Sequence, residues 1–250
     1  MAERFANLFS RQAATYAAGR PRYPGALYDA ILAVTPGRSL AWDCATGNGQ
    51  AAIDLARHFD RVIATDASAE QIAHAAPAPN VEYRVAAAEA SGLGTASVQL
   101  TTVAQALHWL DHERFYGEVR RVTVPGGVLA AWTYGACHAG SDLEPLLREF
   151  EEGLLGPYWD SRRRWVDEGY RTIPFPFDEI SMPAFELRAE WSLSQLGEYL
   201  RSWSAVARYR QAHGEDPVTS LLDRIVKHWG AAEQTREVVW PLSTRVGRLA

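Results

Sequence analysis

Between residues 39 and 134 the sequence alternates short apolar runs with segments typical of helices, and this alternation constrains the fold more than any other feature. Apolar runs bounded by turn residues predict buried strands. Ser68, followed by Glu70 and Gln71, is typical of a helix start. Strands that alternate with helices at short spacing pair in parallel, because each helix carries the chain back across a face of the sheet. We therefore expect an α/β protein with a doubly wound sheet and strands at 39–44, 61–66, 81–86, 98–105 and 127–134.

Polar and small side chains follow the predicted strands. In an open α/β sheet, ligands bind beyond the carboxyl ends of the strands, where the direction of winding reverses. Residues at these ends should therefore gather around one site. The sequence places five candidates there: Asp43, Gly47, Asp66, Glu89 and Gln105.

A glycine-rich turn, with the sequence LAWDCATGNGQAA from Leu40 to Ala52, follows the first strand directly. Gly47, Gly49 and Ala52 match the G-x-G-x-x-A pattern of dinucleotide-binding folds. A pyrophosphate on this turn would meet the carboxylate of Asp43, and like charges about 4 Å apart repel by roughly 4 kcal/mol at an effective dielectric constant near ~20. A cationic ligand reverses the sign of this interaction. S-adenosylmethionine (SAM) is such a ligand, because its amino and sulfonium groups are positive.

Asp66 ends the second predicted strand, 19 positions after Gly47. A carboxylate about 20 residues after the glycine turn is the usual partner of ribose hydroxyls. A carboxylate at this place would also suit the start of the next helix. We favour the ribose-binding interpretation, because the glycine turn and the acid stand in the expected register.

The composition excludes several classes of partner. The net charge of −5 gives no basic surface for nucleic acid, and no apolar run approaches the ~18 residues that span a bilayer. The first residues carry Glu3 and do not resemble a secretory signal. Cys44 and Cys137 are expected to be reduced thiols, and the seven histidines show no metal-ligand spacing. We expect a cytoplasmic monomer or homodimer that binds a small molecule and neither nucleic acid, membrane nor metal.

The segments outside this core predict further elements. Helices are expected at 5–20, 25–34, twice within 141–171, and at 194–209 and 216–229. Two late strands, at 184–192 and 233–249, suit an antiparallel pair at the sheet edge. We expect a single domain over 1–250 that comprises a helical cap (1–35), a SAM-binding core (36–134), a helical insertion on the substrate side (135–180) and C-terminal strands and helices (181–250).

Several segments resemble the motifs of class I SAM-dependent methyltransferases. These are the D-x-G-x-G-x-G-like AWDCATGNGQ (41–50), the ribose-strand end ATDAS (64–68), the adenine-side AAAEASGL (86–93) and RRVTVPGGVLAAW (120–132) with its PGG turn. Three more resemble the small-molecule branch of methyltransferase type 11 and trans-aconitate methyltransferase-like proteins: YAAGRPRYP (16–24), AQALHW (104–109) and IPFPF (173–177).

The resemblance implies a Rossmann-like sheet of seven strands in the order 3-2-1-4-5-7-6, with strand 7 antiparallel and a helical lid. It implies SAM as cofactor and S-adenosylhomocysteine as product. It also implies a set of cofactor-binding residues: Tyr16, Arg20, Asp43, Ala45, Gly47, Gly49, Asp66, Ala67, Gln71, Ala88, Glu89 and Gln105.

Two positions depart from the family pattern. Ala45 stands where the family has its first glycine, and Ala87 stands where an acid is common. If position 45 needs a positive φ, alanine there costs about 1 kcal/mol. If the position needs only a small side chain, alanine is harmless, and we favour this second interpretation.

The acceptor side is less clearly defined by the sequence. His108 follows the fourth strand and is the candidate catalytic residue, either as a general base or as a group that orients the substrate. A structural histidine beside Trp109 is the alternative. Trp109 and Tyr134 are expected to line the substrate cavity, and Arg162 is the candidate for holding an anionic substrate.

We therefore predict a SAM-dependent methyltransferase that acts on a small molecule. A carboxylate is the first guess for the acceptor, by resemblance, and it needs no base because it is ionised at neutral pH. A non-catalytic protein that binds SAM or S-adenosylhomocysteine is one alternative. An NAD(P) oxidoreductase is another, which the carboxylate of Asp43 disfavours.

Overall fold

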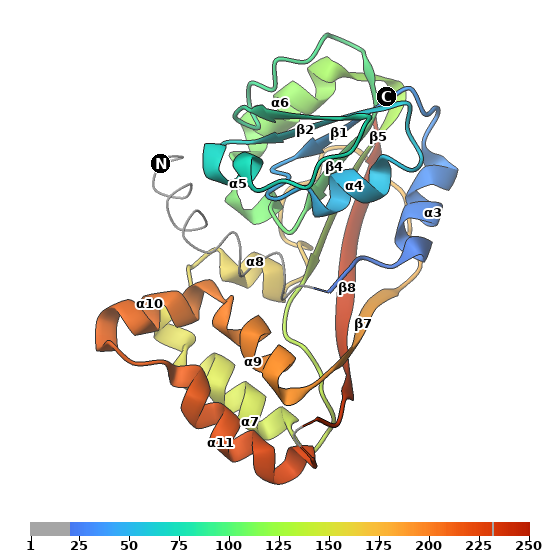
Figure 1. The fold of residues 1–250 in the computed structure, drawn as a ribbon. Coiled ribbons are helices and arrows are strands. Elements are labelled where there is room, and N and C mark those ends of the chain that lie inside the picture. The colour runs from blue at the N-terminus through green and yellow to red at the C-terminus, as the bar shows by residue number, and fades with distance from the viewer. Residues whose placement is uncertain (1–20, 232) are drawn as a thin grey trace.

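The computed structural model describes residues 21–231 and 233–250, so the predicted helix over 5–20 and the predicted roles of Tyr16 and Arg20 lie outside the described residues. Eight strands form one sheet with helices on both faces (Figure 1). The strands are β1 (Leu40–Cys44), β2 (Arg61–Asp66), β3 (Val81–Val85), β4 (Val98–Ala104), β5 (Thr123–Tyr134), β6 (Asp178–Glu179), β7 (Phe185–Trp191) and β8 (Arg236–Arg248).

The helices fill the segments between these strands. The α-helices are α3 (Gly25–Val34), α4 (Gln50–Leu55), α5 (Ala69–Ala73), α6 (His112–Val122), α7 (Glu144–Arg148), α8 (Arg163–Asp167), α9 (Leu193–Arg201), α10 (Ser204–His213) and α11 (Pro217–Trp229). Three segments have other helical geometry: the 3₁₀ turns η1 (Leu107–Trp109) and η3 (Gly156–Tyr158), and the π-helical η2 (Glu149–Leu154). None of the helices in the described parts of the chain is long and apolar enough to cross a membrane.

The predicted sheet order is confirmed. Neighbouring strands run β3-β2-β1-β4-β5-β8, the first five are parallel, and β8 is antiparallel to β5. β7 pairs with the far side of β8, also antiparallel, so β7 and β8 are the sixth and seventh strands of the predicted order. The short β6 pairs with β8 as well. The PGG segment lies inside β5, where the register with β4 shifts, rather than in a turn before the strand.

Side chains alternate between two apolar layers along the central strands. On one face, Ala41 and Trp132 pack in the cluster that includes α3 and α4. On the other face, Trp42 packs against Phe115 of α6, with ring centroids 6.0 Å apart. Such strands, buried on both sides, read as continuous apolar runs, which is why the sequence predicts a parallel sheet so clearly.

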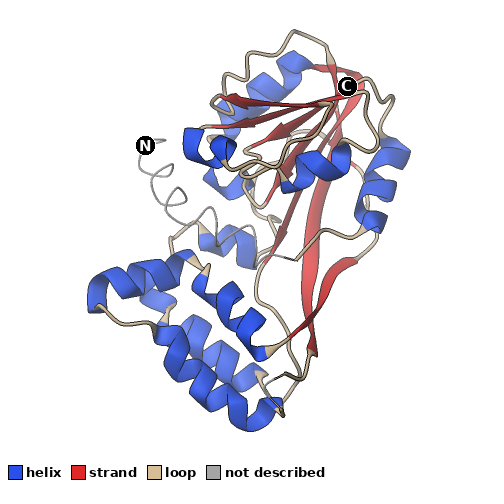
Figure 2. Cartoon of the chain, viewed as in Figure 1, coloured by secondary structure: helices blue, strands red, loops and turns tan. Residues whose placement is uncertain are grey.

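A second group of helices lies beyond the ends of the long strands β5, β7 and β8 (Figure 2). It draws on both 144–158 and 193–229, since α11 contacts α7 as well as α9, and α10 contacts η3. The helical layer therefore uses the C-terminal part of the chain as well as the predicted insertion.

One helix prediction in this layer is wrong. The expected helix over 194–209 is interrupted at Trp203, whose backbone is extended and whose ring packs against Phe150 and Tyr199. Burial of this large ring outweighs continuation of the helix. The two helical stretches expected within 141–171 are present: α7 continues directly into the π-helical η2, and α8 forms the second. The short η3, with Gly156 and Pro157, separates them.

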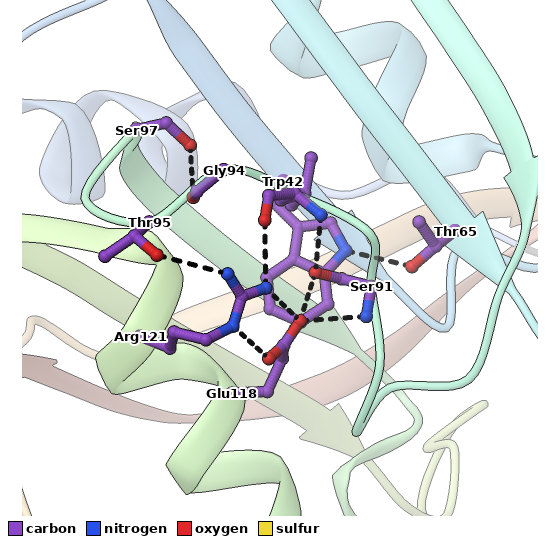
Figure 3. Close-up of polar contacts among 9 residues, drawn as sticks. Trp42, Thr65, Ser91, Gly94, Thr95, Ser97, Glu118 and Arg121 are labelled. Carbon is purple, nitrogen blue, oxygen red and sulfur yellow. Dashed lines mark hydrogen bonds and ion pairs between the residues drawn. The ribbon is translucent and has the colours of Figure 1, made fainter.

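A buried carboxylate ties the loop after β3 to α6 (Figure 3). Glu118 accepts hydrogen bonds from the backbone N–H of Ser91 at 2.9 Å and from the Ser91 hydroxyl at 2.5 Å. Arg121 donates to both oxygens of this carboxylate, and its guanidinium also donates to the Leu93 carbonyl. The hydrogen bonds from Arg121, followed by those from Ser91, lower the pKa of Glu118 to about 2.

Glu118→Gln should lower the free energy of unfolding by about 1–3 kcal/mol at pH 7, since hydrogen bonds to a charged group are lost. Because folding lowers the pKa of Glu118, its contribution is complete above pH ~5 and disappears as the pH falls through ~4 toward 2. Urea unfolding at pH 7 and pH 3 checks this: the difference between wild type and variant should shrink at pH 3.

The matched control is Glu113→Gln, an exposed acid in the first turn of the same helix. It should cost less than about 1 kcal/mol. A difference between wild type and Glu118→Gln that is equally large at both pH values would contradict the role given to Glu118.

Candidate active site

The loop after β1 turns sharply through three left-handed residues. The φ angles are 54° at Ala45, 57° at Gly47 and 88° at Gly49, which begins α4 as its N-cap. A Cβ atom on Gly49 would lie 2.2 Å from the hydroxyl oxygen of Tyr83, so the position admits only glycine. This geometry brings the loop backbone to the carboxyl edge of the sheet.

Asp43 lies beneath this loop, buried at the end of β1. Its carboxylate accepts hydrogen bonds from the hydroxyls of Thr102, at 2.6 Å, and Thr46, at 2.5 Å. Burial raises the pKa of Asp43 to about 6. The residue holds the loop and supplies negative charge from below.

Asp66 lies at the end of β2 and binds the loop directly. Its carboxylate accepts a hydrogen bond from the backbone N–H of Gly47 at 2.9 Å and another from that of Ser68 at 2.8 Å. Burial raises the pKa of Asp66. A carboxylate has about four acceptor sites, so capacity remains for two hydroxyls of a ligand.

A cavity of about 220 Å³, here called the loop cavity, opens above these residues. Asp43 and Gly49 do not line it. The predicted cofactor residues that line it are Ala45, Gly47, Asp66, Ala67, Gln71, Ala88, Glu89 and Gln105. The prediction missed other lining residues, which include Tyr23, Thr46, Asn48, Gln50, Ala51 and Leu110. Thr46 and Asn48 belong to the glycine loop and were within reach of the sequence pattern. Tyr23 belongs to the YAAGRPRYP segment (16–24), of which the prediction named only Tyr16 and Arg20.

The lining of the loop cavity fits an adenosyl ligand with a cationic end. Eight alanines give it flat, apolar walls suited to a planar ring: Ala45, Ala51, Ala67, Ala86, Ala87, Ala88, Ala104 and Ala106. The charged side chains on its described lining are Asp66 and Glu89, without a lysine or arginine to hold a phosphate. The acidic lining therefore suits the positively charged sulfonium and amino groups of SAM better than a pyrophosphate.

A second cavity of about 100 Å³, here called the aromatic cavity, adjoins the first. Five aromatic rings line it: Trp109, Tyr134, Trp159, Tyr199 and Trp203. The predicted His108 lies in it as well. Gln105 and Trp109 line both cavities, so the two spaces meet at the end of β4.

His108 is buried, and its Nδ1 lies 2.8 Å from the hydroxyl of Tyr170. Burial, followed by the positive charges of Arg163 and Arg162, lowers the pKa of His108 to about 3. The imidazole is therefore neutral at neutral pH and binds a proton weakly. This favours an orienting role for His108 over that of a general base.

Arg163, rather than the predicted Arg162, lines the aromatic cavity. Its Nη2 lies 2.5 Å from Glu151, and its Nε lies 2.7 Å from Asp167. None of the described residues accepts a hydrogen bond from its Nη1. The guanidinium of Arg162 instead lies over the ring of Trp109, at 5.6 Å. The segment SRRRW contains three arginines, and α8, which begins within it, has only five residues. A helix this short has no repeating apolar pattern from which the sequence alone could indicate which arginine faces the cavity.

The favoured interpretation of Ala45 is wrong. Its φ of 54° lies in the left-handed region, so the position does require a positive φ, and alanine is strained there. The turn keeps this conformation because hydrogen bonds hold the two residues that follow Ala45. The Thr46 hydroxyl donates to Asp43, and the Gly47 backbone N–H donates to Asp66.

The comparisons with known proteins agree with this geometry. Residues 42–131 match the family described as a methyltransferase domain. A Dictyostelium discoideum protein named as a candidate methyltransferase is 30% identical over 240 residues, which cover 94% of this chain and 91% of the relative. A Mycobacterium bovis protein named as an uncharacterized methyltransferase is 34% identical over 87% of this chain and 83% of its own length.

Among solved structures, a candidate type II methyltransferase from Anaeromyxobacter dehalogenans is 42% identical. It superposes with a TM-score of 0.86 over 92% of this chain and 97% of the other. The fold and the site thus define a methyltransferase. The chain belongs to the class I SAM-dependent methyltransferases and carries a methyltransferase type 11 domain.

Ala45→Gly should raise the free energy of unfolding by up to about 1 kcal/mol, because glycine adopts a positive φ without strain. For a domain of this size the midpoint of thermal unfolding should rise by about 2–4 °C per kcal/mol. Calorimetric or fluorescence-detected melting checks this.

The control is Ala30→Gly in the middle of α3, which should destabilise the protein by about 1 kcal/mol, as expected for glycine in a helix. If Ala45→Gly destabilises the protein to a similar extent, alanine is not strained at position 45.

Proposed function

We propose that this methyltransferase holds SAM in the loop cavity and methylates a small molecule in the aromatic cavity. The observation that supports the proposal is the shared boundary: Gln105 and Trp109 line both cavities. Methyl transfer requires donor and acceptor atoms within about 3–3.5 Å of each other, so two adjoining cavities suit the reaction.

Different residues of the loop cavity would hold different parts of the cofactor. We propose that Asp66 accepts hydrogen bonds from the ribose hydroxyls and that the alanine walls near Ala67 and Ala88 hold the adenine. Negative charge from Asp43 and Asp66 would favour the cationic methionine end. When bound, SAM supplies a methyl group on a positively charged sulfur.

We propose a carboxylic acid as the acceptor, in agreement with the resemblance to the trans-aconitate methyltransferase-like branch. A carboxylate is already ionised at neutral pH, and His108, with a pKa of about 3, would be a weak base for any other acceptor. The Nη1 of Arg163 can donate to a carboxylate oxygen. Asp160 also lines the cavity, but Arg208 lies 3.3 Å from it and offsets its charge.

The protein's own contribution is then to position the acceptor and exclude water. Trp159 is held by a 3.0 Å hydrogen bond from its indole N–H to the Glu151 carbonyl, and the Arg163 guanidinium lies 4.3 Å from its ring centroid. These contacts give the aromatic cavity a fixed wall. An open acceptor cavity argues against a protein that only binds SAM, and the acidic lining of the loop cavity argues against an NAD(P) oxidoreductase.

Calorimetric titration with SAM and S-adenosylhomocysteine tests the cofactor site, with NADH for comparison. Wild type should bind both adenosyl ligands and not NADH. Asp66→Asn should weaken binding by about 10–100-fold, because hydrogen bonds to a charged group are lost.

The matched control for this titration is Asp60→Asn, an exposed acid before the opposite end of the same strand. It should bind as wild type does. Binding of NADH, or unchanged adenosyl affinity in Asp66→Asn, would count against the assignment of the loop cavity.

An assay of S-adenosylhomocysteine formation tests the acceptor class. Small carboxylic acids should support turnover, whereas alcohols and amines of the same size should not. Arg163→Gln should raise KM for the carboxylate by about 10–100-fold and leave SAM affinity nearly unchanged.

The matched control for the acceptor assay is Arg164→Gln, an exposed position on the same helix. Turnover of alcohols or amines that does not depend on Arg163 would show that the acceptor is not a carboxylate.

A further inference from the structure

Gln105 has a strained backbone at the point where the two cavities meet. It follows β4 with a φ of 55°, in the left-handed region that residues other than glycine rarely adopt. Its backbone N–H donates to the Trp132 carbonyl at 2.9 Å. Backbone strain of this kind persists only where the surrounding contacts fix the conformation, and it concentrates at functional sites.

The side chain of Gln105 supplies these contacts. Its Nε2 donates to the Tyr134 carbonyl at 2.9 Å, and its Oε1 accepts a hydrogen bond from the Thr133 hydroxyl. Both ends of the carboxamide are therefore bound to the end of β5. The left-handed turn lets the side chain cross from the end of one strand to the end of the next.

Gln105 is consequently a fixed part of the boundary, and not a mobile side chain beside it. Gln105 lines both the loop cavity and the aromatic cavity, so a ligand in either cavity lies beside it. Trp109 completes the shared boundary. The width of the passage between donor and acceptor depends on these two side chains.

We infer that Gln105 is a positioning residue that limits the passage between the cavities to a group the size of methyl. This inference rests on the proposed placement of SAM in the loop cavity and of the acceptor in the aromatic cavity. It predicts that the protein discriminates between SAM and a SAM analogue with a larger group on the sulfur, and that this discrimination depends on Gln105.

Two substitutions separate the side chain from the backbone. Gln105→Asn keeps a residue that tolerates the left-handed conformation, but its shorter amide does not reach Tyr134. Gln105→Gly removes both the strain and the side chain. The matched control is Ala96→Gly, which relieves a φ of 48° at an exposed position away from both cavities.

The experiment measures calorimetric Kd values for SAM and for S-adenosyl-L-ethionine, which carries an ethyl group in place of the methyl. One extra methylene in a tight site commonly costs about 10–200-fold in discrimination. Wild type and Ala96→Gly should bind the ethyl analogue at least ~10-fold more weakly than SAM. In Gln105→Gly and Gln105→Asn the ratio of the two Kd values should fall to within about threefold.

Thermal unfolding of each variant accompanies the titration. Ala96→Gly should melt no lower than wild type, because it removes a strained φ. Gln105→Gly also loses two side-chain hydrogen bonds to the end of β5, so its melting temperature should lie below that of Ala96→Gly. A general loss of structure would change the Kd values for SAM and for the ethyl analogue by a similar factor. The ratio of the two values is therefore the quantity that tests the inference. A ratio in Gln105→Gly and Gln105→Asn equal to that of wild type would overturn it. Failure of wild type to bind SAM would instead refute the proposed placement of the cofactor.

Discussion

The candidate site depends on a carboxylate that is buried where water cannot solvate it. Asp43 ends the central strand β1, and burial raises its pKa to about 6. The hydroxyls of Thr46 and Thr102 satisfy both of its oxygens and so join the glycine loop to β4. Burial of a charge costs free energy unless a partner compensates it. A cationic ligand in the cavity above would supply that compensation.

Two different parts of the chain build the two cavities. The loop cavity is made by the strand ends and loops of the parallel sheet, where small residues leave space. The aromatic cavity needs residues from 159–166, around the start of α8, and residues from 199–204 in the second group of helices. The π-helical segment η2 matters here, because Glu151 within it binds Arg163 through its side chain and Trp159 through its carbonyl. Departures from regular helix of this kind are frequent at functional sites.

Sequence patterns predicted the place of some site residues and not that of others close to them in the chain. Gly47 and Asp66 could be placed by spacing, because both lie within three residues of a strand end and the pattern fixes which edge they occupy. The sequence could not decide between the two interpretations of Ala45, because a position that needs a small side chain and a position that needs a positive φ both favour small residues. Arg162 and Arg163 are adjacent, and only the packing of α8 against β5 and η1 decides which one faces the cavity.

The sequence by itself determined the α/β class and eight of the residues that line the loop cavity, because local periodicity and fixed spacings along parallel strands carry this information. The strand order followed from the resemblance to class I SAM-dependent methyltransferases. The tertiary structure decided which residues join the predicted His108, Trp109 and Tyr134 around the aromatic cavity. Several of its lining residues come from distant short helices, and the shared wall depends on a hydrogen bond from the Thr133 hydroxyl to Gln105 and another from Gln105 to the Tyr134 carbonyl. Contacts between residues nearly thirty positions apart follow from packing, and no local pattern encodes them.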